Sequence, residues 1–160
     1  KWGYPMPIEL DLNLARVSLQ LEFFAEAEKY IHQYLQVIPE SLEGLLLLGK
    51  IYQEKDEVNL AEETYRKIQG GGVASAKAQN NLGILYIQQK KYKKALDAFN
   101  FSIQFYPQIP DAHYNLGKLI LDIKKNSTLA RKHLEIALAY NQSPSLKQEI
   151  SRLLEQTHSP

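Results

Sequence analysis

The sequence predicts an all-α protein built from a repeated two-helix unit. The dipeptide Leu-Gly occurs at Leu48, Leu82 and Leu116, at equal intervals along the chain. The interval is about 34 residues, and a fixed period of this length is typical of stacked helical repeats. Apolar side chains around each dipeptide follow a helical spacing of three or four residues, as at Leu82, Leu85 and Tyr86. With 160 residues, 44% of them apolar and 23% charged, the chain suits one compact domain or a short repeat array.

Further positions agree with the same period. Leu14 lies one period before Leu48 and is followed by Ala15, a small residue like the glycines. When the four units are aligned, two further positions, which we call columns, hold similar residues. One is a second small column with Ala27, Ala61, Ala95 and Ala130, and the other is a large column with Ile31, Tyr65, Phe99 and Leu134. In the fourth unit both columns come one residue late. A Gly inside a helix costs up to about 1 kcal/mol against Ala, so the repeated Gly predicts a close approach of two helices. We expect the four leucines to hold equivalent buried positions, and the large column to fill the gap toward the next unit.

The periodicity predicts four helix pairs and a final helix. First helices are expected at 8–21, 42–55, 76–89 and 110–124, and second helices at 24–37, 58–69, 92–105 and 127–140. A last helix at 145–156, in which Ser145 and Gln148 fit a capping box, is expected to cover the edge of the fourth unit. The expected organisation is an extended arm at 1–7, four units at 8–41, 42–75, 76–109 and 110–144, the capping helix, and a tail at 157–160.

The pattern resembles the tetratricopeptide repeat (TPR), a helix–turn–helix repeat of about 34 residues with Leu-Gly, Tyr, Ala, Phe and Pro columns. The third unit matches best, with Leu82-Gly83, Tyr86, Ala95, Phe99 and Pro107. The resemblance covers residues 8–142, and the Trp column of the family holds other residues here. It implies a right-handed α-solenoid of four units plus a capping helix, whose first helices line a concave groove that binds an extended peptide or a partner helix.

The resemblance also implies which residues line the groove, because the groove positions of the family can be transferred to the aligned positions of this sequence. They are Asn13, Arg16, Gln20, Leu47, Lys50, Gln53, Lys77, Asn80, Asn81, Ile84, Gln88, Tyr114, Asn115, Lys118 and Asp122. The column that contains Arg16, Lys50 and Lys118 is mostly cationic, which favours a partner segment with acidic character. Asn81 and Asn115 carry both a donor and an acceptor for a peptide backbone. The alternative for all these positions is a polar surface that is simply solvated.

Composition and motifs argue against several other classes of function. The 19 basic and 18 acidic residues give a formal charge of +1, without the basic excess of a dedicated nucleic-acid binder. The absence of Cys excludes disulfides, Cys-ligated zinc and thiol catalysis. No apolar stretch approaches the ~18 residues of a membrane span. The glycines at 70–72 are followed by Ala-Lys-Ala rather than the Gly-Lys-Ser/Thr of a phosphate loop. We expect no enzyme activity, no cofactor and no nucleic-acid partner.

Individual polar residues have plain structural interpretations. His113 replaces a packing residue of the repeat, while His32, His133 and His158 are assigned to the surface or to edges, and no pair has a metal-binding spacing. The charge run Lys90–Lys94 is expected to form a solvated rim, in which Tyr92 belongs to a packing column shared with Phe24 and Val58. The carboxylates in outer or turn positions are expected to be solvated, and they are Glu26, Glu28, Asp56, Glu57, Glu62 and Glu63.

The leading hypothesis is a non-enzymatic adaptor that binds a partner protein or peptide in the groove. The alternative is a structural protein that self-assembles into a homo-oligomer through edge helices or through the arm with Trp2, Tyr4 and Met6. The sequence begins with Lys1 rather than Met, so we expect a trimmed or processed chain. A cytoplasmic and an exported location, periplasmic or as a lipoprotein, are both compatible with it.

Overall fold

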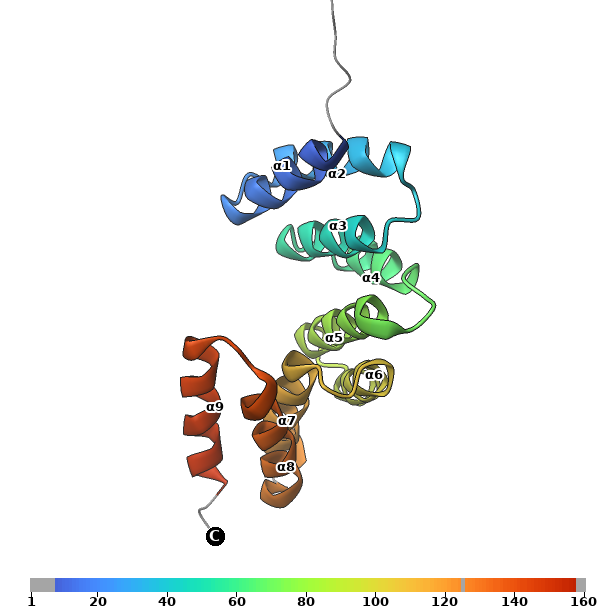
Figure 1. Cartoon of the computed structure of the whole chain (residues 1–160). Coiled ribbons are helices and arrows are strands. Elements are labelled where there is room, and N and C mark those ends of the chain that lie inside the picture. Colours follow the sequence, from blue (N-terminus) through green and yellow to red (C-terminus); the bar gives the residue numbers. More distant parts are fainter. Residues whose placement is uncertain (1–7, 125, 158–160) are drawn as a thin grey trace, which may run out of the picture. The chain divides into compact units, whose positions relative to one another are not determined.

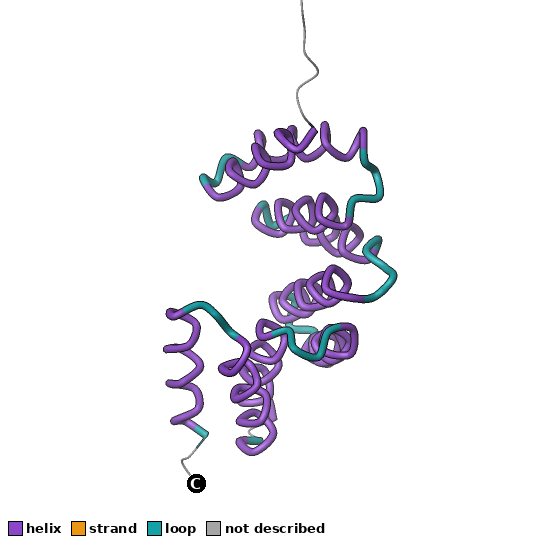
Figure 2. The backbone as a smooth tube through the Cα atoms, viewed as in Figure 1, coloured by secondary structure: helices purple, strands orange, loops and turns teal. Residues whose placement is uncertain are grey.

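The computed structural model describes residues 8–124 and 126–157, and every regular element in these ranges is a helix (Figures 1 and 2). The chain divides into two compact units, Lys1–Gln69 and Gly70–Pro160. The first unit holds α1 (Ile8–Gln20), α2 (Phe24–Val37), α3 (Leu42–Glu54) and α4 (Val58–Arg66). The second holds α5 (Gly72–Gln88), α6 (Tyr92–Phe105), α7 (Pro110–Lys124), α8 (Ser127–Tyr140) and α9 (Pro144–Gln156). The predicted all-α class and helical-repeat architecture are confirmed.

Most predicted helix ends agree with the structure, and α2, α6, α7 and α8 match at both ends. One helix, α5, begins at Gly72, four residues before the predicted start. Gly70, Gly71 and Gly72 all have positive φ, a conformation that costs glycine little, and the Gly71 N–H donates to Ser75 Oγ at 3.1 Å. These contacts let the helix start earlier than the repeat register predicts.

The start of α9 corrects the predicted capping box. Ser143, not Ser145, is the N-cap residue, and its side chain accepts a hydrogen bond from the Leu146 N–H. Pro144 then occupies the first turn, where a missing N–H costs nothing. The arm expected at 1–7 and residues 158–160 of the expected tail lie outside the described residues.

The first three hairpins share one turn geometry. Glu22, Asp56 and Lys90 stand one repeat period apart, and each has a φ of 57° to 61°, the left-handed conformation that non-glycine residues seldom adopt. The residue after each of them donates its N–H to a carbonyl five residues earlier, as in Lys91 to Tyr86 at 2.8 Å. The repeat is therefore present in the backbone as well as in the side-chain pattern.

In the second and third hairpins, the glycine that follows the repeated leucine packs against the residue of the large column. Phe99 and Tyr65 are fully buried. A Cβ added to Gly83 would lie 2.6 Å from Cδ1 of Phe99, and one added to Gly49 would lie 2.7 Å from Cδ1 of Tyr65. The glycine thus makes room for a ring from the second helix of its own hairpin. Whether the large column also fills the gap toward the next unit stays a prediction.

The leucine column is largely buried as expected. Leu48, Leu82 and Leu116 are buried, and Leu14 in α1 is half-buried. Ile150 of α9 lies one repeat period after Leu116 and is also fully buried. It packs against Leu134 and Ala137 of α8, so α9 continues the register of the first helices and covers the fourth hairpin.

Candidate functional site

An open cleft lies between the first helices of the two hairpins in the first unit. It has a volume of about 290 Å³ and is bordered by α1, α3 and the start of α2. We call it cleft 1, and its lining residues are Arg16, Leu19, Gln20, Glu22, Phe24, Leu47, Lys50 and Glu54. Arg16 and Lys50 are among the residues that the sequence predicts for a binding groove.

The second unit has a larger cleft in the corresponding place. It has a volume of about 560 Å³ and is bordered by α5, α7 and the start of α6. We call it cleft 2, and its lining residues are Ile84, Ile87, Gln88, Tyr92, Asn115, Lys118, Leu119, Asp122 and Ile123. Mostly apolar walls with a few polar groups are typical of a ligand-binding surface. Tyr92 begins α6 and is 42% exposed, so its ring faces solvent instead of filling a packing column.

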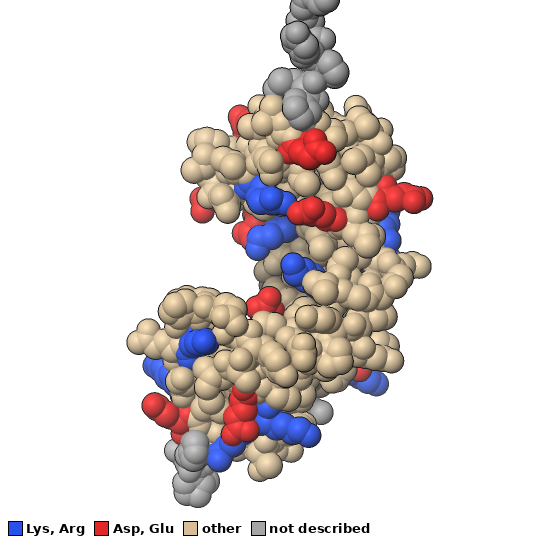
Figure 3. All heavy atoms as spheres, viewed as in Figure 1, with Lys and Arg blue, Asp and Glu red and all other residues tan. Residues whose placement is uncertain are grey.

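The cationic column is not an open stripe of positive charge. In cleft 1, Arg16 Nη2 lies 2.6 Å from Glu43 Oε1, and Lys50 Nζ lies 3.8 Å from Glu54 Oε1. Both pairs are exposed, and exposed ion pairs typically stabilise a protein by only about 0–1 kcal/mol. On the face drawn in Figure 3, basic and acidic residues are likewise interspersed. A carboxylate from a partner can therefore replace these internal carboxylates at small cost.

At cleft 2, α9 places a carboxylate next to the lysine. Tyr114 donates its hydroxyl to Glu149 Oε1 at 2.5 Å, and Lys118 Nζ lies 3.6 Å from the same oxygen. The hydrogen bond from Tyr114 lowers the pKa of Glu149. Burial lowers the pKa of Lys118, but its contacts with Tyr114 and Glu149 outweigh this and raise it. Lys118 is thus charged near neutral pH and already holds a carboxylate.

The predicted asparagines lie at different depths. Asn80 is 5% exposed, and its Oδ1 accepts a hydrogen bond from Asn115 Nδ2 at 2.8 Å. Asn81 is half-buried, and its Oδ1 lies 3.5 Å from Asn80 Nδ2. Asn80 therefore joins α5 to α7 below the surface, while Asn115 lines cleft 2. Their role in peptide binding stays a prediction.

The remaining predicted groove residues lie outside the two clefts. Asn13 is exposed and 3.5 Å from Arg16 Nη1. Gln53 accepts a hydrogen bond from the Tyr65 hydroxyl at 3.2 Å, which links α3 to α4. Lys77 is exposed on α5.

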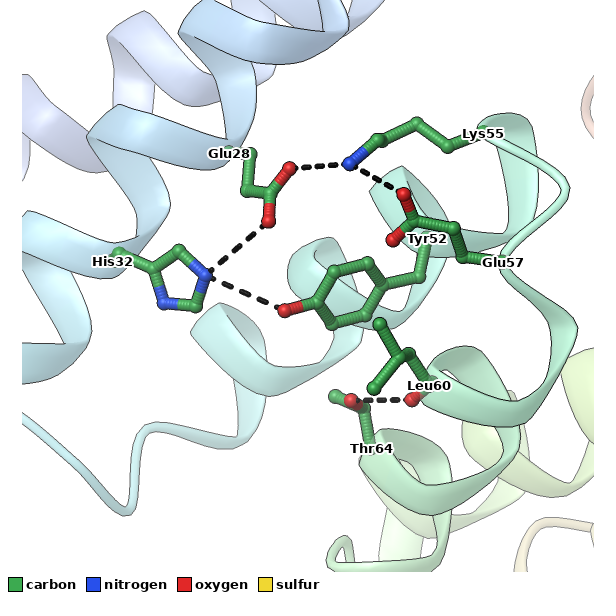
Figure 4. Close-up of polar contacts among 7 residues, drawn as sticks. All are labelled: Glu28, His32, Tyr52, Lys55, Glu57, Leu60 and Thr64. Atoms are coloured by element: carbon green, nitrogen blue, oxygen red, sulfur yellow. Dashed lines mark hydrogen bonds and ion pairs between the residues drawn. The ribbon is translucent and has the colours of Figure 1, made fainter.

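A separate polar cluster joins α2, α3 and the start of α4 (Figure 4). Lys55 Nζ lies 2.5 Å from Glu28 Oε2 and 2.7 Å from Glu57 Oε1, and these hydrogen bonds raise the pKa of Lys55. The Tyr52 hydroxyl lies 3.3 Å from His32 Nε2. Glu28 and Glu57 are half-buried and paired, contrary to the expectation that such carboxylates are solvated. The cluster holds the first hairpin to the second.

Two histidines form a neutral pair in the fourth hairpin. His113 is 3% exposed, and its Nε2 lies 2.9 Å from the Pro107 carbonyl. Because a carbonyl only accepts, Nε2 carries the proton, and Nδ1 accepts from His133 Nδ1 at 3.0 Å. Burial lowers the pKa of both rings, that of His133 to about 4, and repulsion from His113 in its protonated form and from Lys132 adds to the lowering at His133. His133 is half-buried, and the sequence analysis does not predict its pairing with His113.

Within residues 8–124 and 126–157, no three His, Cys, Asp or Glu side chains come together in a group able to hold a metal ion. None of the described helices combines the length and apolar character that crossing a membrane requires.

Family models for the tetratricopeptide repeat match the chain at residues 42–69 and again at residues 76–109. The chain is a TPR protein. Proteins of this family generally mediate protein–protein interactions and are typically not enzymes. Among the curated proteins, this TPR protein is similar to the type IV pilus assembly protein PilF of Pseudomonas aeruginosa, at 30% identity over 132 residues. The alignment covers 81% of the TPR protein and 52% of PilF, so the chain spans about half the length of this relative.

Solved structures support the fold of the TPR protein. A structure of PilF from Pseudomonas aeruginosa matches with a TM-score of 0.71 at 24% identity, over 96% of this chain and 77% of that one. A structure of YrrB, described as a TPR protein with an unusual peptide-binding site, matches with a TM-score of 0.62 at 12% identity, over 92% and 74% of the two chains. At these identities, the structures show the fold alone.

Sequence reasoning misses several residues of the two clefts in this TPR protein. It assigns Phe24 and Tyr92 to a packing column, although each is the first residue of a second helix and lines a cleft. The acidic residue that it misses is Glu54. A signal for it is present, because an acidic residue recurs at Asp122, at twice the repeat length.

Proposed function

We propose that this TPR protein is a non-enzymatic adaptor that binds a segment of a partner protein in cleft 2. The observation that carries the proposal is the combination of an exposed aromatic ring, an apolar floor and a charged lysine in one cleft of about 560 Å³. Exposed aromatic side chains next to apolar walls are the residues that most often dominate binding energy at protein interfaces. A protein segment as the ligand also agrees with the family, whose members generally mediate protein–protein interactions.

The chemistry of cleft 2 indicates what the segment looks like. Ile84 and Ile87 offer an apolar surface next to Tyr92, which suits one large apolar side chain of the ligand. Lys118 already holds the carboxylate of Glu149, so its position accepts an acidic group. We therefore propose a short segment with a large apolar residue followed or preceded by an acidic one.

The test begins with the selection of binding peptides from a random phage-displayed library, with the full chain as the target. Binding of a selected peptide is mapped by the shifts of backbone amide signals in NMR, and we expect the residues of cleft 2 to shift. Tyr92→Ala removes the aromatic wall and is expected to weaken binding at cleft 2 about tenfold or more. Lys118→Glu is expected to weaken it less, with an effect that shrinks at high salt.

Phe101→Ala is the matched control, because Phe101 is an aromatic residue of the same helix, is 52% exposed and does not line the cleft. Shifts confined to the face around Phe101, or a Tyr92→Ala variant that keeps full shifts in cleft 2, contradict the proposal. A library that yields no binding peptide contradicts it as well.

A second candidate function follows from the likeness to PilF. The 30% identity to a type IV pilus assembly protein over 132 residues supports a role in assembling pili in the organism that makes this chain. Removal of its gene is then expected to reduce the number of surface pili seen by electron microscopy, and a copy of the gene restores them. Normal pili without the gene contradict this role.

Self-assembly stays a prediction. Residues 1–7, which carry the aromatic arm of that hypothesis, lie outside the described part of the chain.

A further inference from the structure

Five lining residues of cleft 1 match lining residues of cleft 2 in chemical type at a distance of two repeat periods, whereas Arg16 and Leu47 stand where cleft 2 has Ile84 and Asn115. Leu19 corresponds to Ile87, and both are aliphatic. The other matched pairs are Gln20 with Gln88, Phe24 with Tyr92, Lys50 with Lys118, and Glu54 with Asp122. Each cleft thus offers an aliphatic wall, an aromatic ring, an amide, a lysine and a carboxylate at matching positions along the chain.

The backbone places these groups in the same way. Beside cleft 1, Glu22 has φ 61° and donates its N–H to the Leu19 carbonyl at 3.1 Å. Beside cleft 2, Lys90 has φ 57° and donates to the Ile87 carbonyl at 2.8 Å. The aromatic residue follows two positions later and begins the second helix of its hairpin in both units. The two clefts therefore present their aromatic rings from the same turn.

Repetition of the fold alone does not explain this correspondence. Framework residues such as the glycines that follow Leu48, Leu82 and Leu116 recur once in every repeat period. Two of the four columns that hold the matched pairs recur in every second period instead, whereas the column of Lys50 and Lys118 also holds the basic Arg16. One of them reads Gln20, Glu54, Gln88, Asp122, and another reads Phe24, Val58, Tyr92. Residues that only maintained the repeat would follow the shorter period, whereas a site built by two neighbouring hairpins follows the longer one.

We infer that cleft 1 is a second site for the same kind of segment that binds in cleft 2, so that one chain binds two such segments. The inference rests on the proposed function. A large apolar side chain of the ligand packs against Leu19 and Phe24, and its acidic neighbour pairs with Lys50 in place of Glu54. Cleft 1 has Arg16 where cleft 2 has Ile84, and Leu47 where cleft 2 has Asn115. Cleft 1 is also smaller, so it encloses less of its segment and binds it more weakly than cleft 2.

Isothermal titration calorimetry of the full chain with a library-selected peptide tests the inference. We expect two peptides per chain for the wild type. We expect one for Tyr92→Ala, one for Phe24→Ala and none for the double variant. Val58→Ala is the matched control, because Val58 holds the same column but lines neither cleft, and it should still bind two.

A second pair of variants covers the case in which loss of an aromatic residue disturbs folding. Lys50 and Lys118 are both exposed, so Lys50→Glu and Lys118→Glu should each weaken one of the two binding steps and leave the circular dichroism spectrum unchanged. One peptide per wild-type chain, lost in Tyr92→Ala but not in Phe24→Ala, overturns the second site and leaves the proposed function intact. Failure of any peptide to bind overturns both.

Discussion

Gly83→Ala is expected to lower the free energy of unfolding by about 1–3 kcal/mol, the usual range for overpacking a core. A Cβ at this position would meet three ring atoms of Phe99, the farthest of them at 2.7 Å. Phe99 is fully buried, so its ring has no open space into which it can move. The substitution is destabilising even though Ala is favoured over Gly inside a helix by about 1 kcal/mol. Urea denaturation followed by circular dichroism measures the change.

The first hairpin supplies the matched comparison for this variant. There the same two columns hold Ala15 and Ile31, both fully buried, so a Cβ is accommodated when the opposite side chain is smaller than a ring. Phe99→Ile alone is expected to cost about 1–3 kcal/mol through the cavity that it leaves. The double variant Gly83→Ala/Phe99→Ile should be more stable than the sum of the single effects predicts, by about 1 kcal/mol or more. Strict additivity would show that the glycine and the ring do not depend on each other.

Acidification from pH 6.5 to pH 5 is expected to destabilise the protein by about 1–2 kcal/mol through the pair of His113 and His133. Burial holds the pKa of both rings below the ordinary value of 6.5, that of His133 at about 4. The unfolded chain therefore binds more protons than the folded one in this range. Stability that is fully present above pH 6.5 is lost as the pH falls toward 4. The stated magnitude allows for solvent screening at His133, which is half-buried.

Denaturation curves at pH 7, 6 and 5 measure the effect. His133→Gln removes one titrating ring and keeps a side chain able to hydrogen-bond His113, so its stability should depend less on pH. His32→Gln, which leaves the pair intact, should follow the wild type. Equal stability of the wild-type protein at pH 7 and pH 5 would refute the assignment of a neutral pair.

The sequence is sufficient to predict the helices because their signals are local and are repeated. Leu48, Leu82 and Leu116 share one environment, and the two ends of α6 follow from its periodicity and from Pro107. The early start of α5 is not predictable from that register, because it depends on the conformations of Gly70, Gly71 and Gly72. The contact of Phe99 with Gly83 is likewise not visible in the spacing, which does not show which way a ring points.

The candidate site is predicted less well than the fold. The first helices indeed border both clefts, and Lys50 and Lys118 line them. Phe24 and Tyr92 escape prediction, because an aromatic residue at the start of a second helix has the same pattern whether it packs or stays exposed. The pairing of His113 with His133 joins two helices, so no spacing on a single helix indicates it.

The fit between a glycine and a ring has a consequence for protein engineering and for evolution. Both partners of this fit belong to the same hairpin, so a complete hairpin can be transplanted with its interior matched, whereas a single transplanted helix brings a mismatch such as Ala opposite Phe99. Recombination points in the connections at 38–41 and 106–109 preserve the matches at Gly49 and Gly83, although a point at 38–41 separates Gly44 from the Tyr34 ring that lies against it. New arrays with altered combinations of clefts should therefore be obtainable by shuffling whole hairpins.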